Sequence, residues 1–364
     1  MQSVRRTPGK GREFLRFERR RDDSSESYTL QMSEEAVQTD ARLGRALVAL
    51  QEWKSLTSEE WGAAAGVPTS EAWRLAEELR KLGVEVSRSG EGWKLVGEAD
   101  LALPEVLEPL IAGTVFAGGV RHFAQIGSTS AAAMRAGVDG AGANSTRGLV
   151  WLAEEQTAGK GRAGHVWESN PRDGIYCSAL LRPKLSPTDV IIFSLAAGLA
   201  VVDAVHEVTG LWGDLRWPND VLLKGRKFCG ILTELNAEVT RVRFVVVGVG
   251  MNVNNESFAP ELREIATSLR MEAGRKFSRV PLVAALLRAL DREQAALQGG
   301  VGAARASILQ RFEEHSSHCR GAAVVVEEDG GYEGVTRGLD ERGFLRVETS
   351  AGMRTVLSGG VRTR

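Results

Sequence analysis

The spacing of apolar residues is helical in the first patterned part of the chain. Leu43, Leu47 and Leu50 repeat at intervals that place them on one face of a helix. A second helix is expected to start at Thr57, because Thr57 and Glu60 have the spacing of a capping box. These two helices indicate a small helical unit near the N-terminus.

A third helix is expected over residues 70–82 and is ended by Gly83. Its predicted buried positions are Trp73, Ala76, Leu79 and Leu82. Two short apolar runs joined by a Gly-rich turn then predict a β-hairpin over residues 84–96. Three helices followed by a two-stranded wing indicate a winged helix-turn-helix DNA-binding domain over residues 40–97.

The segments on either side of this unit lack its pattern. Residues 1–31 are rich in Arg, Ser and Asp and have no sustained apolar period. Such a composition cannot bury enough apolar surface to fold, so we expect a disordered tail over residues 1–39. Residues 97–113 contain Pro104 and Pro109 and are expected to connect two domains.

Residues 113–316 have a mixed pattern of strands and helices. Ser128-Thr129-Ser130 is expected to cap a helix. The remaining expected elements are strands at 148–154, 175–181, 221–223, 228–235 and 243–249, and helices at 188–210 and 281–298. Residues 317–364 contain only short strands between Gly and Asp turns, which is typical of a small SH3-like β-barrel. The predicted fold class is therefore multidomain α+β.

Composition narrows the classes of function. A formal net charge of −1 over 364 residues confines any nucleic-acid contact to a local patch. Three cysteines, far apart and without a CxxC pair, fit a reducing cytoplasm and argue against a disulfide framework. No apolar run reaches membrane-spanning length and the N-terminus lacks the apolar core of a signal peptide. We therefore expect a soluble, cytoplasmic protein without membrane contact.

The stretch Trp151–Trp167 joins a short apolar run to a loop that contains three glycines, Lys160 and Arg162. Glycines let backbone N–H groups approach a ligand, and the two cations suit a phosphate or a developing anion. The pattern Gly159-x-Gly161-x-x-Gly164 matches a dinucleotide-binding fingerprint, but Pro171 follows soon after and no helix can continue there. A Walker A loop is also absent. A mobile surface loop is as consistent with these residues as a ligand-binding loop.

A second group of charged residues follows downstream, at Arg216-Trp217-Pro218-Asn219-Asp220 and at Lys224, Arg226 and Lys227. From composition alone, Lys227 is more simply a solvated turn lysine. The segment Trp217–Asp220 is more simply an Asx turn behind a buried tryptophan. His315 and His318 have helical spacing, but a third supported ligand is missing, so no metal site is predicted.

Several motifs occur in the order seen in biotin protein ligases. They are Ser128-Thr129-Ser130, Glu155–Arg162 (EQTAGKGR), Arg216–Asp220 (RWPND), Arg226–Glu234 (RKFCGILTE) and Gly248–Asn254 (GVGMNVN). With the helical unit in front and the small barrel behind, the chain from about Asp40 resembles the bifunctional biotin protein ligase/biotin-operon repressor family. The resemblance implies a central ligase domain of the class II aminoacyl-tRNA-synthetase-like type.

The resemblance implies that biotin and ATP, with Mg²⁺, form biotinyl-5'-AMP, and that a lysine of the biotin carboxyl carrier protein of acetyl-CoA carboxylase is then biotinylated. Fixed cations suit this chemistry, because a carboxylate must approach a triphosphate. The implied catalytic residues are Lys227 and Arg162, and no metal-ligating residue is implied. The residues implied to bind biotin or the adenylate are Ser128, Thr129, Ser130, Gln156, Gly159, Lys160, Gly161, Arg162, Trp167, Asn219, Asp220, Lys227, Gly230, Gly250 and Asn252. The glycine loop becomes a lid over the reactive anhydride.

The chain departs from the family pattern at two places. Ser130 stands where the family often has asparagine, so one hydrogen bond to biotin is expected to differ. Lys160, Ala163 and His165 replace part of an arginine-rich loop, which puts tight retention of the adenylate in doubt.

The resemblance also implies a homodimer that binds biotin operator DNA through the helix 70–82. Arg74, Arg80 and Lys81 favour contact with DNA phosphates. Glu71, Glu77 and Glu78 on the same helix oppose it, so a purely structural winged helix stays open as a second interpretation. Three different functions also stay open: a biotin-sensing transcription factor without ligase activity, a lipoate or octanoate ligase and, distantly, an NAD-dependent oxidoreductase.

Overall fold

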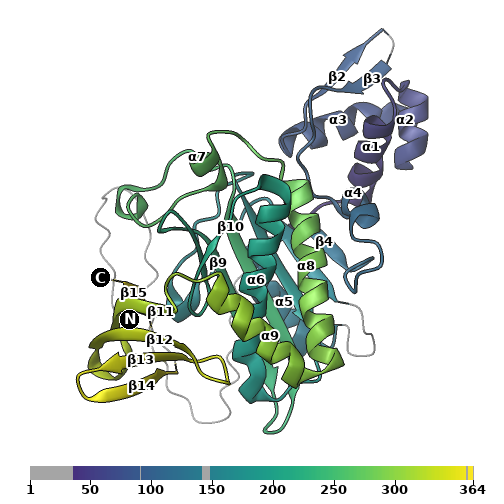
Figure 1. Cartoon of the computed structure of the whole chain (residues 1–364). Coiled ribbons are helices and arrows are strands. Elements are labelled where there is room, and N and C mark those ends of the chain that lie inside the picture. The colour runs from purple at the N-terminus through teal and green to yellow at the C-terminus, as the bar shows by residue number, and fades with distance from the viewer. Residues whose placement is uncertain (1–35, 91, 142–147, 358–359, 364) are drawn as a thin grey trace, which may run out of the picture. The chain divides into compact units, whose positions relative to one another are not determined.

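The computed structural model describes residues 36–90, 92–141, 148–357 and 360–363. Within them, eight strands form a central sheet of order β1-β4-β5-β6-β10-β9-β8-β7 (Figure 1). Its strands are β1 Val37–Gln38, β4 Val120–Gln125, β5 Leu149–Ala153, β6 Gly174–Leu181, β7 Asp214–Arg216, β8 Asp220–Leu223, β9 Arg226–Ala237 and β10 Val242–Asn252. Neighbouring strands are antiparallel except for β4 and β5, which are parallel.

The two faces of this sheet bury separate apolar clusters, because side chains alternate between the faces along each strand. Leu180 belongs to the cluster beneath α5 (Thr129–Val138). Its neighbour Leu181 belongs to the larger cluster that includes α6 (Val190–Thr209) and α8 (Arg279–Gly299). The central domain is therefore a mixed α/β sandwich with helices on both faces of one sheet.

The long apolar helix α6 is a core element, as its composition predicts. Among the described residues, it is the one helix that is long enough and apolar enough to cross a membrane. However, 78% of its most apolar stretch is buried inside the protein. Helix α9 (Val301–Glu314) packs against it. The sequence patterns did not predict α9, because its buried positions Ala304, Ile308 and Phe312 form only a narrow stripe in a polar segment.

Residues 41–95 form three helices and a hairpin: α1 Ala41–Glu52, α2 Ser58–Ala65, α3 Ala72–Lys81, β2 Val86–Ser89 and β3 Gly92–Leu95. The predicted capping box between Thr57 and Glu60 is present. Helix α3 begins later than predicted, after a 3-10 turn. The helical repeat places the buried residues Ala72, Leu75, Ala76 and Leu79 on one face, and Trp73 lies beside that face and is 47% exposed. The predicted burial of Trp73 was wrong.

The segments around this unit are more ordered than predicted. Residues 1–35 of the predicted 1–39 tail lie outside the described residues. Val37 and Gln38 pair with β4, so these two residues belong to the central sheet and not to a tail. A two-residue strand is too short for any periodicity to reveal. The connector 97–113 contains α4 (Pro104–Leu107) and is buried at several leucines.

The C-terminal segment is all-β, as predicted. Its strands are β11 Arg320–Val326, β12 Tyr332–Leu339, β13 Leu345–Thr349, β14 Gly352–Val356 and β15 Val361–Thr363, in the order β14-β13-β12-β11-β15. Trp217 Nε1 donates to Gly343 O at 2.9 Å, which fastens this sheet to the segment that precedes β8.

Candidate functional site

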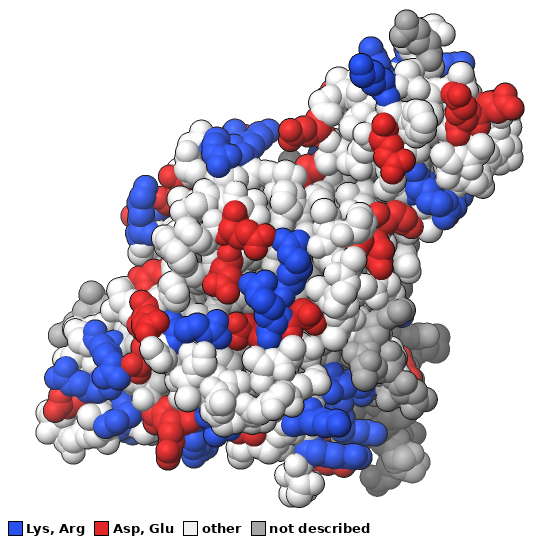
Figure 2. All heavy atoms as spheres, turned by 45° about the vertical axis from the view of Figure 1, so that its right-hand side comes forward, with Lys and Arg blue, Asp and Glu red and all other residues white. Residues whose placement is uncertain are grey.

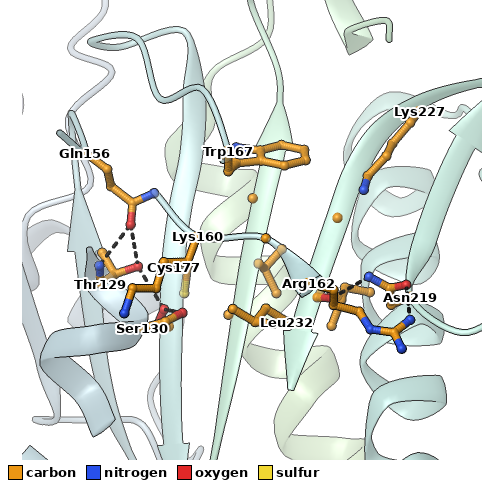
Figure 3. Close-up of a pocket in the computed structure, with 17 residues that line it drawn as sticks. Thr129, Ser130, Gln156, Lys160, Arg162, Trp167, Cys177, Asn219, Lys227 and Leu232 are labelled. Atoms are coloured by element: carbon orange, nitrogen blue, oxygen red, sulfur yellow. Dashed lines mark hydrogen bonds between the residues drawn. The ribbon is translucent and has the colours of Figure 1, made fainter. Parts of the chain in front are cut away.

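A cavity lies over the middle strands of the central sheet, between the start of α5 and the loop that follows β5 (Figure 3). The predicted residues that line it are Thr129, Ser130, Gln156, Lys160, Gly161, Arg162, Trp167, Asn219, Lys227, Gly230 and Gly250. Motifs that are far apart in the sequence therefore meet at one place. Figure 3 shows the hydroxyl and amide groups at one end of this cavity and Lys227, Arg162 and Asn219 at the other.

The first end of the cavity is a cluster of hydroxyl and amide groups. Ser178 Oγ lies 2.8 Å from Thr129 Oγ1 and 2.9 Å from Ser130 Oγ. Gln156 Oε1 accepts from Thr129 N at 2.9 Å and from its Oγ1 at 3.1 Å. Gln156 Nε2 donates to Ser169 Oγ at 2.9 Å. Because hydroxyls can donate or accept, this end can pair with a ligand that carries both N–H and C=O groups.

Local structure explains how this cluster forms. Ser128 is the N-cap of α5, and its hydroxyl accepts from Ala131 N at 3.3 Å. Beyond the parallel strands β4 and β5, Ile126 bridges to Gln156. The ends of two parallel strands lie at the same edge of a sheet. The first turn of α5 is therefore held beside Gln156.

The indole of Trp167 lies over a pair of glycines. Gly230 and Gly250 are cross-strand partners on β9 and β10. A Cβ at residue 250 would lie 2.5 Å from Trp167 Cε2, and one at residue 230 would lie 2.9 Å from Cζ3. Both positions must be glycine because the ring approaches the backbone so closely. Trp167 Nε1 is buried and has no hydrogen-bond partner among the described residues, so it can donate to a ligand only if the ring moves.

The second end of the cavity is charged. Lys227 Nζ lies 2.6 Å from Asp220 Oδ1, and Arg216 Nη2 lies 2.7 Å from Asp220 Oδ2. Burial by itself would raise the pKa of Asp220, but the Lys227 ammonium and the Arg216 guanidinium outweigh it and hold that pKa below its usual value. Lys227 Nζ also lies 5.4 Å from the centre of the Trp167 ring. An ionised Asp220 thus holds Lys227 at the cavity wall.

The glycine loop folds back on itself beside this end. Trp167 N donates to Gly159 O at 3.0 Å, and Gly161 N donates to His165 O at 2.7 Å. Arg162 Nη1 donates to Asn219 Oδ1 at 3.0 Å, which fastens the loop to the segment before β8. Burial lowers the pKa of the Arg162 guanidinium, and the Asp220 carboxylate offsets part of that effect. The loop closes one side of the cavity and adds a cation to it.

Four predicted residues lie beside the cavity and not in its wall. The hydroxyl of Ser128 is used to cap α5. Gly159 is required by packing, since a Cβ there would lie 2.3 Å from Trp167 O. Asp220 contacts Lys227, and Asn252 Nδ2 donates to Thr267 O at 3.1 Å.

Several cavity residues were missed by sequence reasoning. Ser178 joins two predicted hydroxyls, and the one available signal was a polar residue inside the apolar run 175–181. Cys177 lines the same wall, and burial raises the pKa of its thiol to about 12. The remaining unpredicted lining residues are Ile231, Leu232, Gly248 and Val249. These positions lie within the motifs 226–234 and 248–254, but none of them has a polar side chain, so only strand pairing reveals that they line the cavity.

Two further hollows share Trp167 and Lys227 with the cavity. The first is mostly apolar and is lined by Val166, Phe258, Leu262, Ile265 and Ala266, together with Asn252 and Asn255. The second lies between the segment Arg216–Asp220 and residues Glu327, Gly360, Val361 and Arg362 of the C-terminal segment. Trp167 and Lys227 therefore stand where three spaces meet.

No three histidine, cysteine, aspartate or glutamate side chains are grouped to hold a metal ion in the described ranges. His315 stacks on Trp212 with 5.1 Å between the ring centroids. His318 Nε2 lies 3.4 Å from Asp214 Oδ2. The two histidines thus contact different partners.

Comparisons with known proteins agree with this geometry. A model of the biotin/lipoate A/B protein ligase family matches residues 142–252, and a model of the biotin protein ligase C-terminal domain matches residues 321–361. The bifunctional ligase/repressor BirA of Bacillus subtilis (strain 168) is 30% identical over 309 residues, which cover 84% of this chain and 93% of the relative. The biotin–[acetyl-CoA-carboxylase] ligase of Mycobacterium tuberculosis is 35% identical over 244 residues, which cover 65% of this chain and 85% of the relative.

A solved structure is similar as well. The biotin protein ligase from Aquifex aeolicus in complex with biotin and ATP has a TM-score of 0.57 and 26% identity, and the match covers 68% of this chain and 99% of that chain. The matches reach both the central and the C-terminal segments. The chain belongs to the biotin protein ligase family.

Proposed function

We propose that the chain is an ATP-dependent biotin protein ligase, which joins biotin to AMP and then transfers biotin to a lysine of a biotin carboxyl carrier protein. The names of the relative from Mycobacterium tuberculosis and of the Aquifex aeolicus complex support these substrates. The observation that carries the proposal is a single cavity with hydroxyl and amide groups at one end and Lys227 and Arg162 at the other. Such a cavity suits a ligand with a polar, uncharged head and an anionic tail.

Biotin fits this cavity in one direction. Its ureido ring has two N–H donors and one carbonyl acceptor, which match the groups of Thr129, Ser130, Ser178 and Gln156. The acyl chain would run beside the Trp167 ring, because that ring already covers the backbone of Gly230 and Gly250. Its carboxylate would then face Lys227.

In the first step, a carboxylate oxygen of biotin attacks the α-phosphorus of ATP. A carboxyl–phosphorus anhydride bond forms, the bond from the α-phosphorus to the bridging oxygen breaks, and pyrophosphate leaves. Both reactants are anions, so fixed positive charge lowers the barrier. We assign Lys227 to the carboxylate and the bridging phosphoryl oxygen, and Lys160 and Arg162 to the adenylate.

Mg²⁺ fits this site as an ion that binds together with ATP. Both oxygens of Asp220 are already paired, one with Lys227 and one with Arg216. The ion would therefore be held chiefly by phosphate oxygens of ATP, as Mg²⁺ often is. When bound, it neutralises charge on the leaving pyrophosphate.

The nucleotide would occupy the two hollows that adjoin Lys227. The apolar hollow, with Phe258 and Ile265 in its wall, suits a purine ring. The other hollow has Arg216 and Arg362 in its wall, and phosphate oxygens would compete there with Asp220 and Glu327, the present partners of these arginines. Apart from Arg216, this placement assigns nucleotide contacts to residues that no sequence motif indicated.

In the second step, a neutral lysine amine of the carrier attacks the carbonyl carbon of the anhydride. An amide bond forms, the bond from the carbonyl carbon to the phosphate oxygen breaks, AMP leaves with the bonding electrons, and the proton of the amine passes to solvent water. Asp220 is a weak base, because Lys227 and Arg216 hold its pKa low. We therefore assign Asp220 to orient Lys227 and to accept a hydrogen bond from the incoming amine. The loop fastened by Arg162 to Asn219 would keep water from the anhydride.

A free strand edge supports the expected homodimer. Residues 233–237 of β9 pair with β10 but extend past β8, and the hydrogen bonds of the described residues leave their other edge open. The Thr233 hydroxyl there has no hydrogen-bond partner in the same ranges. Open strand edges pair readily with another chain. We propose that two copies join through this edge.

We also propose repression of transcription as a second activity. The Bacillus subtilis relative is named a ligase/repressor, and residues 41–95 have the element order of a winged helix-turn-helix. Arg74 and Lys81 are exposed on α3. Figure 2 shows basic and acidic side chains interspersed on the face in view, so DNA contact would rest on a few local cations. We infer the class II synthetase-like and SH3-like folds for the central and C-terminal domains from the same family resemblance.

The ligase is tested with the purified full chain, biotin, ATP, Mg²⁺ and an apo carrier domain. We expect pyrophosphate release, bound biotinyl-AMP and a biotinylated carrier. Pyrophosphate release without any carrier labelling would reject the transfer step, and no release at all would favour a biotin-sensing transcription factor. Preferred labelling with lipoate or octanoate would reject biotin as the substrate. An operator gel shift with and without biotin and ATP tests repression.

A further inference from the structure

The backbone of Lys227 is paired with a segment that follows β10 in the chain. Lys227 N donates to Ile265 O at 2.8 Å, and Thr267 N donates to Lys227 O at 2.9 Å. These two bonds form a parallel bridge opposite Ala266. Thr267 O in turn accepts from Asn252 Nδ2 at 3.1 Å. Because a lysine ammonium stands at the end of a flexible stem, these backbone bonds fix the point from which that stem starts.

The carboxylate of Glu272 holds side chains from both partners of this pairing. Glu272 belongs to α7 (Leu269–Ala273), which comes shortly after the paired segment. Its Oε1 accepts from Arg226 Nη2 and from Thr267 Oγ1, each at 2.6 Å. Arg226 directly precedes Lys227, and Thr267 donates to the Lys227 carbonyl. One carboxylate oxygen therefore ties the two backbones together beside Lys227.

Glu272 is a buried anion at this position. Its side chain is 3% exposed, and its Oε2 lies 3.1 Å from Lys224 Nζ. Burial by itself would raise the pKa of Glu272, but hydrogen bonds from Thr267 and the two cations hold that pKa below its usual value. The Lys224 side chain is 75% exposed, so its ion pair contributes little to the attachment. The two hydrogen bonds to Oε1 therefore carry it.

We propose that Glu272 is a positioning residue for Lys227 in adenylate formation. Glu272 lines neither the cavity nor the two hollows that adjoin it, so it acts through the lysine and not on a ligand. Asp220 holds the ammonium of Lys227, and Glu272 holds its backbone. The inference rests on the proposed function in taking Lys227 as the group that faces the reacting carboxylate and the α-phosphate. Misplacement of such a group by about 1 Å can cost about 10²-fold in rate.

Removal of the carboxylate tests this assignment in the full chain. Glu272→Ala releases Arg226 and the Thr267 hydroxyl together. At saturating biotin and ATP, the kcat of pyrophosphate release is expected to fall about ten- to hundredfold, because the ammonium is no longer held in place. Glu272→Gln keeps an oxygen that can accept from both donors, so its kcat is expected to stay within about threefold of the wild type. Equal kcat values in the two variants would overturn the inference.

Glu293→Ala is the matched control. Glu293 is a buried carboxylate of α8 whose two oxygens each lie 2.8 Å from a guanidinium nitrogen of Arg311. This variant is expected to lose stability in thermal unfolding and to keep the wild-type kcat. An equal fall in kcat in Glu293→Ala and Glu272→Ala would show that general destabilisation is the cause, and it would overturn the inference.

A milder variant carries the test if Glu272→Ala does not fold. Thr267→Val removes one of the two donors to Glu272 but keeps the backbone N–H that bonds Lys227 O. Its kcat is expected to fall about three- to tenfold, because one attachment remains. A wild-type kcat in this variant would contradict the assignment.

A double variant decides whether Glu272 acts through Lys227. In a Lys227→Met background, adding Glu272→Ala is expected to lower the remaining kcat by less than about twofold, because substitutions that remove one shared interaction are not additive. A further fall as large as that in the wild-type background would overturn the inference. A wild-type chain that releases no pyrophosphate, or a Lys227→Met variant with the wild-type kcat, would refute the proposed function or its assignment of Lys227 instead.

Discussion

Replacing Lys227 with methionine tests the charged end of the cavity. Methionine keeps an apolar stem near Trp167 but removes the ammonium that lies 2.6 Å from Asp220 Oδ1. In the proposed first step, this ammonium faces the negative charge that develops between the carboxylate and the α-phosphate. Loss of one such preorganised group costs about 10²- to 10³-fold in rate, so adenylate formation is expected to slow by that factor.

The same substitution is expected to lower the free energy of unfolding, because Asp220 loses a charged partner. The Asp220 side chain is 17% exposed and would keep only Arg216, at 2.7 Å, as a charged partner. Loss of one hydrogen-bonded partner from such a site costs about 1–3 kcal/mol. Adding Asp220→Asn removes the negative charge that Lys227 no longer neutralises. The Lys227→Met/Asp220→Asn variant should therefore regain much of the free energy of unfolding without regaining activity.

Pyrophosphate release in the presence of biotin measures the first step, and urea unfolding measures stability. Lys224→Met is a matched control on the same hairpin, because Lys224 Nζ pairs with Glu272 Oε2 at 3.1 Å. Lys224 does not line the cavity. This control is expected to form the adenylate at the wild-type rate.

A Lys227→Met variant within about threefold of the wild-type rate would remove this ammonium from the mechanism, since threefold corresponds to well under 1 kcal/mol of barrier. Equal losses in Lys224→Met and Lys227→Met would also refute the reasoning. They would show that the hairpin's structure, and not a charge in the cavity, controls the reaction.

Three further predictions concern the cavity and the ion pairs of Asp220 beside it. Gly250→Ala places a Cβ 2.5 Å from the Trp167 ring, so the ring must move, and we expect at least about a tenfold rise in the biotin Kd and a shift in tryptophan fluorescence. Ser178→Ala removes the hydroxyl 2.8 Å from Thr129 Oγ1 and should raise the biotin Kd about five- to tenfold by calorimetry. The folded pKa of Asp220 lies below its usual value of 3.8, so its stabilising contribution is complete above that value and is lost as the pH falls through the folded pKa. Thermal unfolding between pH 7 and about pH 3 should show a smaller decrease in Asp220→Asn.

Each of these predictions has an outcome that contradicts it. Gly90→Ala meets no atom within 4 Å and should be neutral; equal affinity of Gly250→Ala and Gly90→Ala for biotin would show that the ring does not need the bare backbone. Ser186→Ala is the control for Ser178→Ala, because the Ser186 hydroxyl bonds Thr188 and Asp189 away from the cavity. If both variants lost the same biotin affinity, a specific role of Ser178 would be refuted. Identical pH profiles of the wild type and Asp220→Asn would contradict the ion-pair argument.

The sequence by itself determined the elements that depend on groups close along the chain. The capping box of Thr57 with Glu60, the N-cap at Ser128 and the apolar length of α6 were predictable for this reason. A cap or a helical period involves residues a few positions apart, so it is present before any tertiary contact forms. The order of the motifs likewise indicated the family, which the comparisons then confirmed.

Tertiary structure alone decided which groups share a hydrogen bond or a charge. The placement of Ser178 between the hydroxyls of Thr129 and Ser130 depends on how β6 and α5 are packed. Trp167 can rest on Gly230 only because strand pairing sets the neighbouring glycine beside it. The joining of His122 to Arg279 through the Glu154 carboxylate is equally invisible in the sequence. Contacts between residues dozens of positions apart arise only when the chain has folded, so no local pattern records them.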